Sequence, residues 1–98
     1  MNKINYLLLT IHEQYMHRCI ELAKHGAGYV APNPMVGAVL VYNEQIIGEG
    51  YHREYGKAHA EVNCIADAEM RLTASGRLTH ETISQSVLYV SLEPCVHF

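Results

Sequence analysis

The first clear pattern along the chain is helical. Apolar residues recur at intervals of three and four within residues 11–25, namely Met16, Cys19, Ile20 and Ala23. Thr10 precedes them, and Glu13 follows it three residues later, which is the spacing of a capping box. The pattern predicts a first helix over residues 11–25, ending near Gly26.

Two apolar runs follow, at residues 36–42 and 46–51, with a short turn at residues 43–45 between them. The first run is rich in valine, and together they predict an antiparallel pair of strands. Before them, residues 29–34 contain two prolines on either side of Asn33. Because a proline lacks a backbone donor and restricts the residue before it, this segment is predicted to be an irregular, stiff loop.

The second half of the chain repeats the alternation of helix and strand. Residues 59–70 carry apolar side chains at helical spacing, and residues 87–92 predict a buried strand. Residues 71–86 between them are polar and indicate no clear element. The order helix, strand, strand, helix, strand predicts an α/β fold in which helices cover a sheet. The third strand is then an edge unless more chain follows.

Length and charge narrow the class of protein. A chain of 98 residues suits one small domain, and 49% hydrophobic with 17% charged residues is ordinary for a globular chain. The net charge of -3 comes without a basic cluster, so neither nucleic acid nor an anionic membrane is an expected partner. A small-molecule partner is favoured.

Two features bear on the compartment. The apolar run at residues 6–11 is too short to span a bilayer, and no cleavage site for an export signal follows it. The three cysteines are Cys19, Cys64 and Cys95, an odd number, widely scattered. That usage fits a reducing compartment, and a cytoplasmic location is predicted.

The chemistry centres on two stretches, KAHAEVNC at residues 57–64 and LEPCVHF at residues 92–98. His59 and Cys95 are residue types that bind zinc, and a catalytic zinc takes three protein ligands and a water. Glu61, two residues after His59, would diverge from it by about 200 degrees on a helix. It is thus predicted to face the zinc-bound water as a proton shuttle without binding the metal. On its own, HAE is more often a solvated pair or a helix cap. A PC pair after a buried strand favours the site, and the reaction indicated is hydrolytic deamination.

The two stretches resemble the zinc deaminase signature, HxE followed by PCxxC. Position 98 holds Phe98 where that signature needs cysteine, which disfavours the deaminases with the short spacing. The segments YMHRCIELAKHG, PNPMVGAVLV, GEGYHREYGKAHAEV and YVSLEPCVHF resemble the diaminohydroxyphosphoribosylaminopyrimidine deaminases of riboflavin biosynthesis, the N-terminal half of a bifunctional deaminase and reductase. In that family the second cysteine follows a longer loop, as in PCSHxGxTPPC, so the resemblance implies that this chain ends inside the second zinc motif.

The resemblance implies roles for six residues: zinc ligands His59 and Cys95, catalytic proton shuttle Glu61, and substrate-binding Asn33, His52 and His97. The third zinc ligand is expected from a cysteine beyond residue 98. By residue type alone, Asn33 could equally hold a turn through its side chain, and His52 and His97 would more often be surface histidines. Cys19 and Cys64 are predicted to be small buried apolar residues.

The resemblance also implies a fold and a substrate. The fold is a cytidine-deaminase-like three-layer α/β fold, a mixed sheet flanked by helices, incomplete in this chain, with residues 1–98 forming one zinc-dependent deaminase domain. The substrate is 2,5-diamino-6-(5-phosphoribosylamino)pyrimidin-4-one, and NADP is expected only if a reductase domain follows. Residues 71–86 exceed the usual family length and indicate a surface insertion, and Val96 replaces the usual serine. A homo-oligomer is compatible with all of this.

Two other functions stay open at this point. One is a zinc deaminase of the cytidine, guanine or tRNA-adenosine type, against which the Phe98 spacing and the lack of basic patches count. The other is a zinc-binding or assembly module without catalytic activity, which a chain lacking one zinc ligand would fit.

Overall fold

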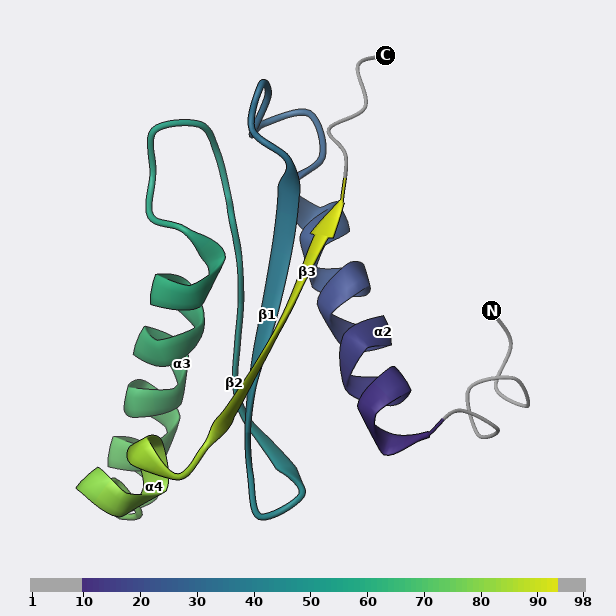
Figure 1. Ribbon diagram of the computed structural model, residues 1–98. Helices are drawn as coiled ribbons and strands as arrows, with labels where there is room; N and C mark the ends of the chain where they lie inside the picture. Colours follow the sequence, from purple (N-terminus) through teal and green to yellow (C-terminus); the bar gives the residue numbers. More distant parts are fainter. Residues whose placement is uncertain (1–9, 94–98) are drawn as a thin grey trace.

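The computed structural model describes residues 10–93 and shows the predicted alternation of helices and strands (Figure 1). The elements are α2 Ile11–Ala23, the 3-10 turn η1 Lys24–Gly26, β1 Met35–Tyr42, β2 Gln45–Tyr51, α3 Ala60–Ala74, α4 His80–Ser84 and β3 Val87–Glu93. Each predicted helix and strand is present at nearly its predicted bounds. The prediction that residues 87–92 form a buried strand was wrong in its burial, because Val87, Leu88, Val90 and Leu92 are exposed in the part of the chain that the structure describes. Within these residues, no helix has the length and apolar character needed to cross a membrane.

The sheet has the order β2-β1-β3, and both neighbouring pairs are antiparallel. Gly37, near the start of β1, lies opposite Tyr51 at the end of β2 and opposite Ser91 near the end of β3. The start of the central strand and the ends of both outer strands therefore meet at one end of the sheet. The loops before β1 and after β2 lie at this same end (Figure 1).

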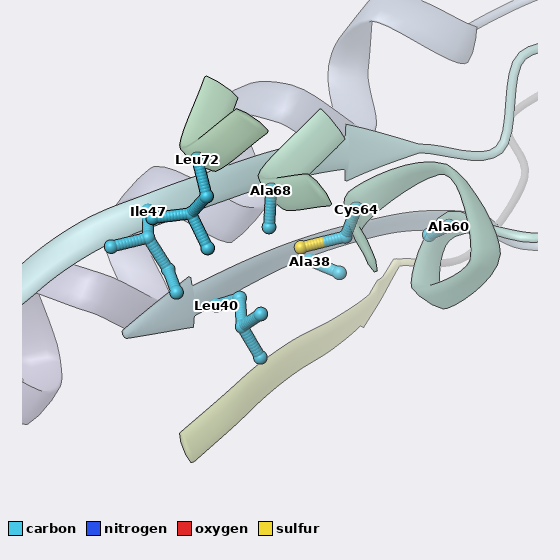
Figure 2. Packing of buried hydrophobic residues seen from close by; sticks show 7 residues of the cluster. All are labelled: Ala38, Leu40, Ile47, Ala60, Cys64, Ala68 and Leu72. Carbon is cyan, nitrogen blue, oxygen red and sulfur yellow. The ribbon is translucent and has the colours of Figure 1, made fainter. Parts of the chain in front are cut away.

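Helices cover both faces of the sheet, with α2 on one side and α3 on the other (Figure 1). Alternate residues of β1 point to opposite faces, as the period of a strand requires. The α2 side buries Tyr15, Cys19, Leu22, Val39 and Val41. The α3 side buries Ala38, Leu40, Ile47, Ala60, Cys64, Ala68 and Leu72 (Figure 2). This layering confirms the predicted three-layer α/β class, and the three described strands are all antiparallel. Both Cys19 and Cys64 are fully buried, as predicted.

The start of α2 is fixed by the capping box that the sequence predicted. The Thr10 hydroxyl accepts a hydrogen bond from the Glu13 backbone N–H at 3.2 Å, and the Glu13 carboxylate accepts one from the Thr10 N–H at 3.3 Å. Two backbone donors that a helix leaves unpaired at its start are thereby satisfied.

Helix α3 lies directly against β2 because two positions on that strand are glycine. A Cβ atom on Gly50 would lie 2.7 Å from the Ala60 carbonyl oxygen, and one on Gly48 would lie 2.6 Å from the Ala68 Cβ. Either contact is far closer than packed atoms tolerate. The absence of these side chains brings the first turn of α3 beside the end of β2.

The prediction that residues 71–86 contain no clear element was wrong. Helix α3 continues to Ala74, and α4 follows with Thr79 as its N-cap, its hydroxyl accepting from the Thr82 N–H at 3.0 Å. No residue of α4 is buried, so the apolar periodicity that marks a helix in sequence is missing from it. The segment lies on the surface of the molecule.

Candidate active site

A cavity of about 320 Å³ opens where the start of β1, the end of β2, the start of α3 and the end of β3 meet. Its polar lining is Asn33, His52, His59 and Glu61, and its apolar wall is Pro34, Val36, Val90 and Leu92. Four of the six residues to which the resemblance assigns a role thus line one cavity, although they come from three separate segments. The other two, Cys95 and His97, lie outside the described residues.

His52 follows the last residue of β2 and is only 3% exposed. Its backbone N–H donates to the Val36 carbonyl at 3.0 Å, which continues the pairing of β2 with β1. In the side chain, Nδ1 lies 3.2 Å from the Ala58 carbonyl oxygen and Nε2 lies 3.5 Å from Nδ2 of Asn33. The interpretation of His52 as a surface histidine is therefore wrong.

His59 is the N-cap residue of α3 and has an extended backbone, with φ -74° and ψ 164°. Its ring makes no capping hydrogen bond and packs edge-on against the His52 ring, with 5.4 Å between the centroids. Since His59 precedes the helix, the helical divergence of about 200 degrees from Glu61 does not apply. Glu61, in the first turn of α3, lines the same cavity as His59.

Asn33 does not close its turn with its side chain. The turn is closed by the backbone, because the Asn33 N–H donates to the Val30 carbonyl at 2.8 Å. The half-buried side-chain amide instead faces His52 in the cavity. This geometry favours ligand binding over a purely structural role.

Sequence reasoning missed Asn63, one helical turn after His59. Its Nδ2 donates to the Tyr51 carbonyl at 2.9 Å and to the Ala58 carbonyl at 3.3 Å. Tyr51 is the last residue of β2, and Ala58 lies in the segment between β2 and α3 that carries His52 and His59. The only sequence signal was the position of Asn63 beside the HAE motif, and residue type alone gave no reason to select it.

Within residues 10–93, His59 and Glu61 are compatible with part of a zinc site. His59 offers an imidazole that makes no hydrogen bond within residues 10–93, and Glu61 stands beside it as a carboxylate. In the same range, no three histidine, cysteine or acidic side chains come together as a metal cluster. Burial raises the pKa of the Cys64 thiol to about 12, which disfavours the thiolate that zinc binds. A zinc ion held at His59 would therefore need ligands from outside the described residues.

The family model for the cytidine and deoxycytidylate deaminase zinc-binding region matches residues 9–97. The chain belongs to this family of zinc-binding deaminase domains. This membership agrees with the layered fold and with the histidine and glutamate found at the start of α3.

Within the family the chain is most informatively compared with proteins of riboflavin biosynthesis. It is 46% identical over 86 residues to the riboflavin biosynthesis protein RibD of Bacillus amyloliquefaciens, a match that covers 88% of this chain and 20% of that protein. It is 42% identical over 84 residues to a diaminohydroxyphosphoribosylamino-pyrimidine deaminase of Buchnera aphidicola, covering 86% of this chain and 50% of that protein.

A solved structure shows the same fold. The diaminohydroxyphosphoribosylaminopyrimidine deaminase/5-amino-6-(5-phosphoribosylamino)uracil reductase of Thermotoga maritima matches with a TM-score of 0.70 and 44% identity, covering 90% of this chain and 23% of that one. The chain thus spans about a fifth to a half of the length of these relatives. The likeness extends over nearly all of this chain.

Proposed function

We propose that the protein deaminates 2,5-diamino-6-(5-phosphoribosylamino)pyrimidin-4-one hydrolytically, as a step of riboflavin biosynthesis. The observation that carries the proposal is the convergence of Asn33, His52, His59 and Glu61 on one cavity of about 320 Å³. A cavity of this size suits a small heterocycle. The substrate is supported by the relatives, which are named for this deaminase or for riboflavin biosynthesis.

In this proposal His59 and Cys95 are zinc ligands. Zinc, when bound, lowers the pKa of a water molecule toward about 7 and so makes it a nucleophile at neutral pH. Glu61 is free to take the proton from that water, because its carboxylate has no partner among residues 10–93. It then passes protons to the ring nitrogen and to the departing amine.

The overall reaction is balanced by one water and one ammonia. A carbon–oxygen bond forms at the ring carbon that bears the 2-amino group, and the carbon–nitrogen bond to that group breaks. Asn33 and His52 hold the polar edge of the pyrimidine, while Val36, Val90 and Leu92 contact its apolar face. Orientation of this kind supplies much of the rate enhancement when a bound water attacks a bound ring.

Metal analysis and ammonia release, measured on the same sample, test the proposal. The full-length protein is offered the diaminopyrimidine ribotide, cytidine, deoxycytidylate and guanine in parallel, since the third zinc ligand is expected from a cysteine beyond residue 98. We expect the protein to contain bound zinc and to release ammonia from the ribotide but not from the other three compounds. A chelator should remove the zinc and abolish ammonia release, and added zinc should restore both.

The other functions give different results in this assay. Bound zinc with no ammonia from any substrate would indicate a non-catalytic zinc module. A preference for cytidine, deoxycytidylate or guanine would indicate a different deaminase. Ammonia release that survives complete removal of zinc would contradict the mechanism.

A further inference from the structure

The carbonyl oxygen of Ala58 is an unusual point in the site because two side chains converge on it. Nδ2 of Asn63 donates to it at 3.3 Å, and Nδ1 of His52 lies 3.2 Å from it. Ala58 immediately precedes His59, so these contacts fix the backbone at the entrance to α3. His52 thus contacts the Ala58 carbonyl through its side chain, and His59 follows the same residue along the chain.

The Ala58 carbonyl determines the tautomer of His52. A carbonyl oxygen can only accept a hydrogen bond, so Nδ1 of His52 must carry the hydrogen. In the neutral ring, Nε2 then bears a lone pair and can only accept. The hydrogen bond between Nδ1 and the Ala58 carbonyl therefore makes Nε2, the ring nitrogen that faces Asn33, a hydrogen-bond acceptor in the neutral ring.

The tautomer in turn orients Asn33. Because Nε2 of His52 accepts, the Asn33 atom that lies 3.5 Å away must be the Nδ2 donor, as the structure places it. The Oδ1 atom of Asn33 remains as an acceptor, and no hydrogen bond holds it within the described residues. The site is thus set to receive an N–H group of a ligand, such as an amino group or a protonated ring nitrogen.

Asn63 is built to hold the Ala58 carbonyl in place. A primary amide has two N–H hydrogens, and the Nδ2 of Asn63 meets two carbonyls, that of Tyr51 at 2.9 Å and that of Ala58 at 3.3 Å. One donor group thus joins the last residue of β2 to the residue before His59. An aspartate of the same shape would instead present an oxygen to two carbonyl oxygens.

We propose that Asn63 is a positioning residue: by holding the Ala58 carbonyl, it sets the Nδ1–H tautomer of His52 and, through His52, the donor and acceptor pattern that Asn33 presents to a ligand. Asn63 itself does not line the cavity. Its effect on turnover rests on the proposed function, whereas its effect on the His52 tautomer does not.

Nitrogen NMR of the intact protein, labelled with ¹⁵N histidine, tests the tautomer directly. The His52 signals are identified by their loss in His52→Gln. We expect a protonated Nδ1 and an unprotonated Nε2 in the natural protein. In Asn63→Ala the ring should shift toward the Nε2–H tautomer that a free imidazole favours. Asn63→Ser, which keeps one donor, replaces the alanine variant if that does not fold.

Val62→Ala is the matched control, because Val62 is the neighbouring α3 residue and is 60% exposed. It should leave the His52 signals unchanged. A natural protein with the hydrogen on Nε2, or an Asn63 variant that folds and keeps the natural tautomer, would overturn the proposal.

Kinetics provide the second measurement. We expect Asn63→Ala to lower kcat/KM about 10- to 100-fold, the usual effect of removing a group that orients residues of a site, with Val62→Ala near the natural value. An unchanged kcat/KM in an Asn63→Ala protein whose tautomer has shifted would contradict the link to ligand binding. If the natural protein releases no ammonia, the proposed function fails while the tautomer result still stands.

Discussion

Two groups of polar side chains on this small fold differ in their hydrogen bonds and ion pairs. One group is paired within the chain, whereas the other includes side chains without a partner among the described residues. On the β2 edge, Glu49 accepts from Nε of Arg18 at 2.6 Å and from Nη2 of Arg71 at 3.3 Å. Arg71 also pairs with Asp67 at 2.9 Å, and Asp67 accepts from the Glu49 backbone N–H at 2.8 Å. Every one of these charges is paired within the chain.

The cavity at the end of the sheet is different. Within residues 10–93, the side chains of His59 and Glu61 make no hydrogen bond and no ion pair. His59 is exposed and Glu61 is half-buried, so water can hydrogen-bond both side chains and their lack of a partner costs the fold little. The Glu49 cluster joins α2, β2 and α3, whereas the cavity side chains are left available to a ligand. The comparison predicts that substitutions in the first group change stability and those in the second change activity.

The largest effect is expected from Glu61→Gln. Glutamine keeps the shape of the side chain but cannot carry a proton between water and a leaving amine. Ammonia release should fall by about 10²- to 10⁴-fold, the usual contribution of a general acid and base. Zinc content and melting temperature should stay near their natural values, because Glu61 is not one of the proposed ligands and its side chain has no partner within residues 10–93.

Glu69→Gln is the matched control for this substitution. It makes the same chemical change on the same helix at an exposed position and should leave the rate unaltered. A Glu61→Gln protein that loses its zinc would indicate that Glu61 is a ligand. Retention of most of the activity would remove Glu61 from the mechanism.

Asn33→Ala is expected to have the next largest effect. Its turn is closed by the backbone, so the fold should lose little, while the ligand loses a hydrogen-bonding partner. A lost hydrogen bond of about 1–3 kcal/mol corresponds to about a 5- to 150-fold lower kcat/KM. Kinetics and thermal unfolding are measured together. A collapse of stability with normal kinetics in the folded fraction would show that Asn33 is only a turn residue.

The sequence predicted the order of elements because most of them follow an apolar period. Helix α2, strand β1 and helix α3 each carry buried side chains at the expected spacing, whereas β3 was predicted from an apolar run that stays largely exposed within the described residues. Helix α4 was missed because it has only five residues, and Ile83 is the single apolar side chain among them that packs, partly buried, against the core. The turn of Asn43 and Glu44, both at positive φ, shows no glycine signal, and the Tyr15 hydroxyl supports it by donating to the Glu44 carbonyl at 3.0 Å.

The candidate site was predictable in its members but not in its geometry. The motifs selected His59 and Glu61, and the resemblance added Asn33 and His52, all of which line one cavity. The burial of His52 depends on pairing between β1 and β2, which residue type cannot show. The role of Asn63 depends on two backbone carbonyls distant from it in space until the chain folds. Unlike the capping box of Thr10 and Glu13, these contacts of Asn63 with the backbone follow no recognised sequence pattern.

The smallest effect is expected from Glu49→Gln, and it should appear in stability alone. The hydrogen bond from Arg18 is the main cause that lowers the pKa of Glu49 below its usual value. Both arginines are partly exposed, so solvent and salt screen the pairs, and a loss of about 1 kcal/mol in unfolding free energy at pH 7 is expected. Ammonia release should be unchanged, since Glu49 lies outside the cavity lining.

The pH dependence of this loss has a definite sign. Because the folded protein holds Glu49 at a lower pKa than the unfolded chain, the stabilisation is fully present above the unfolded value of about 4.3 and disappears as the pH falls through the folded value. Urea unfolding of the natural and Glu49→Gln proteins should therefore differ at pH 7 and converge in acid, while Glu69→Gln should match the natural protein at pH 7. A difference that persists undiminished at low pH would mean that Glu49 stabilises by packing and not by its charge.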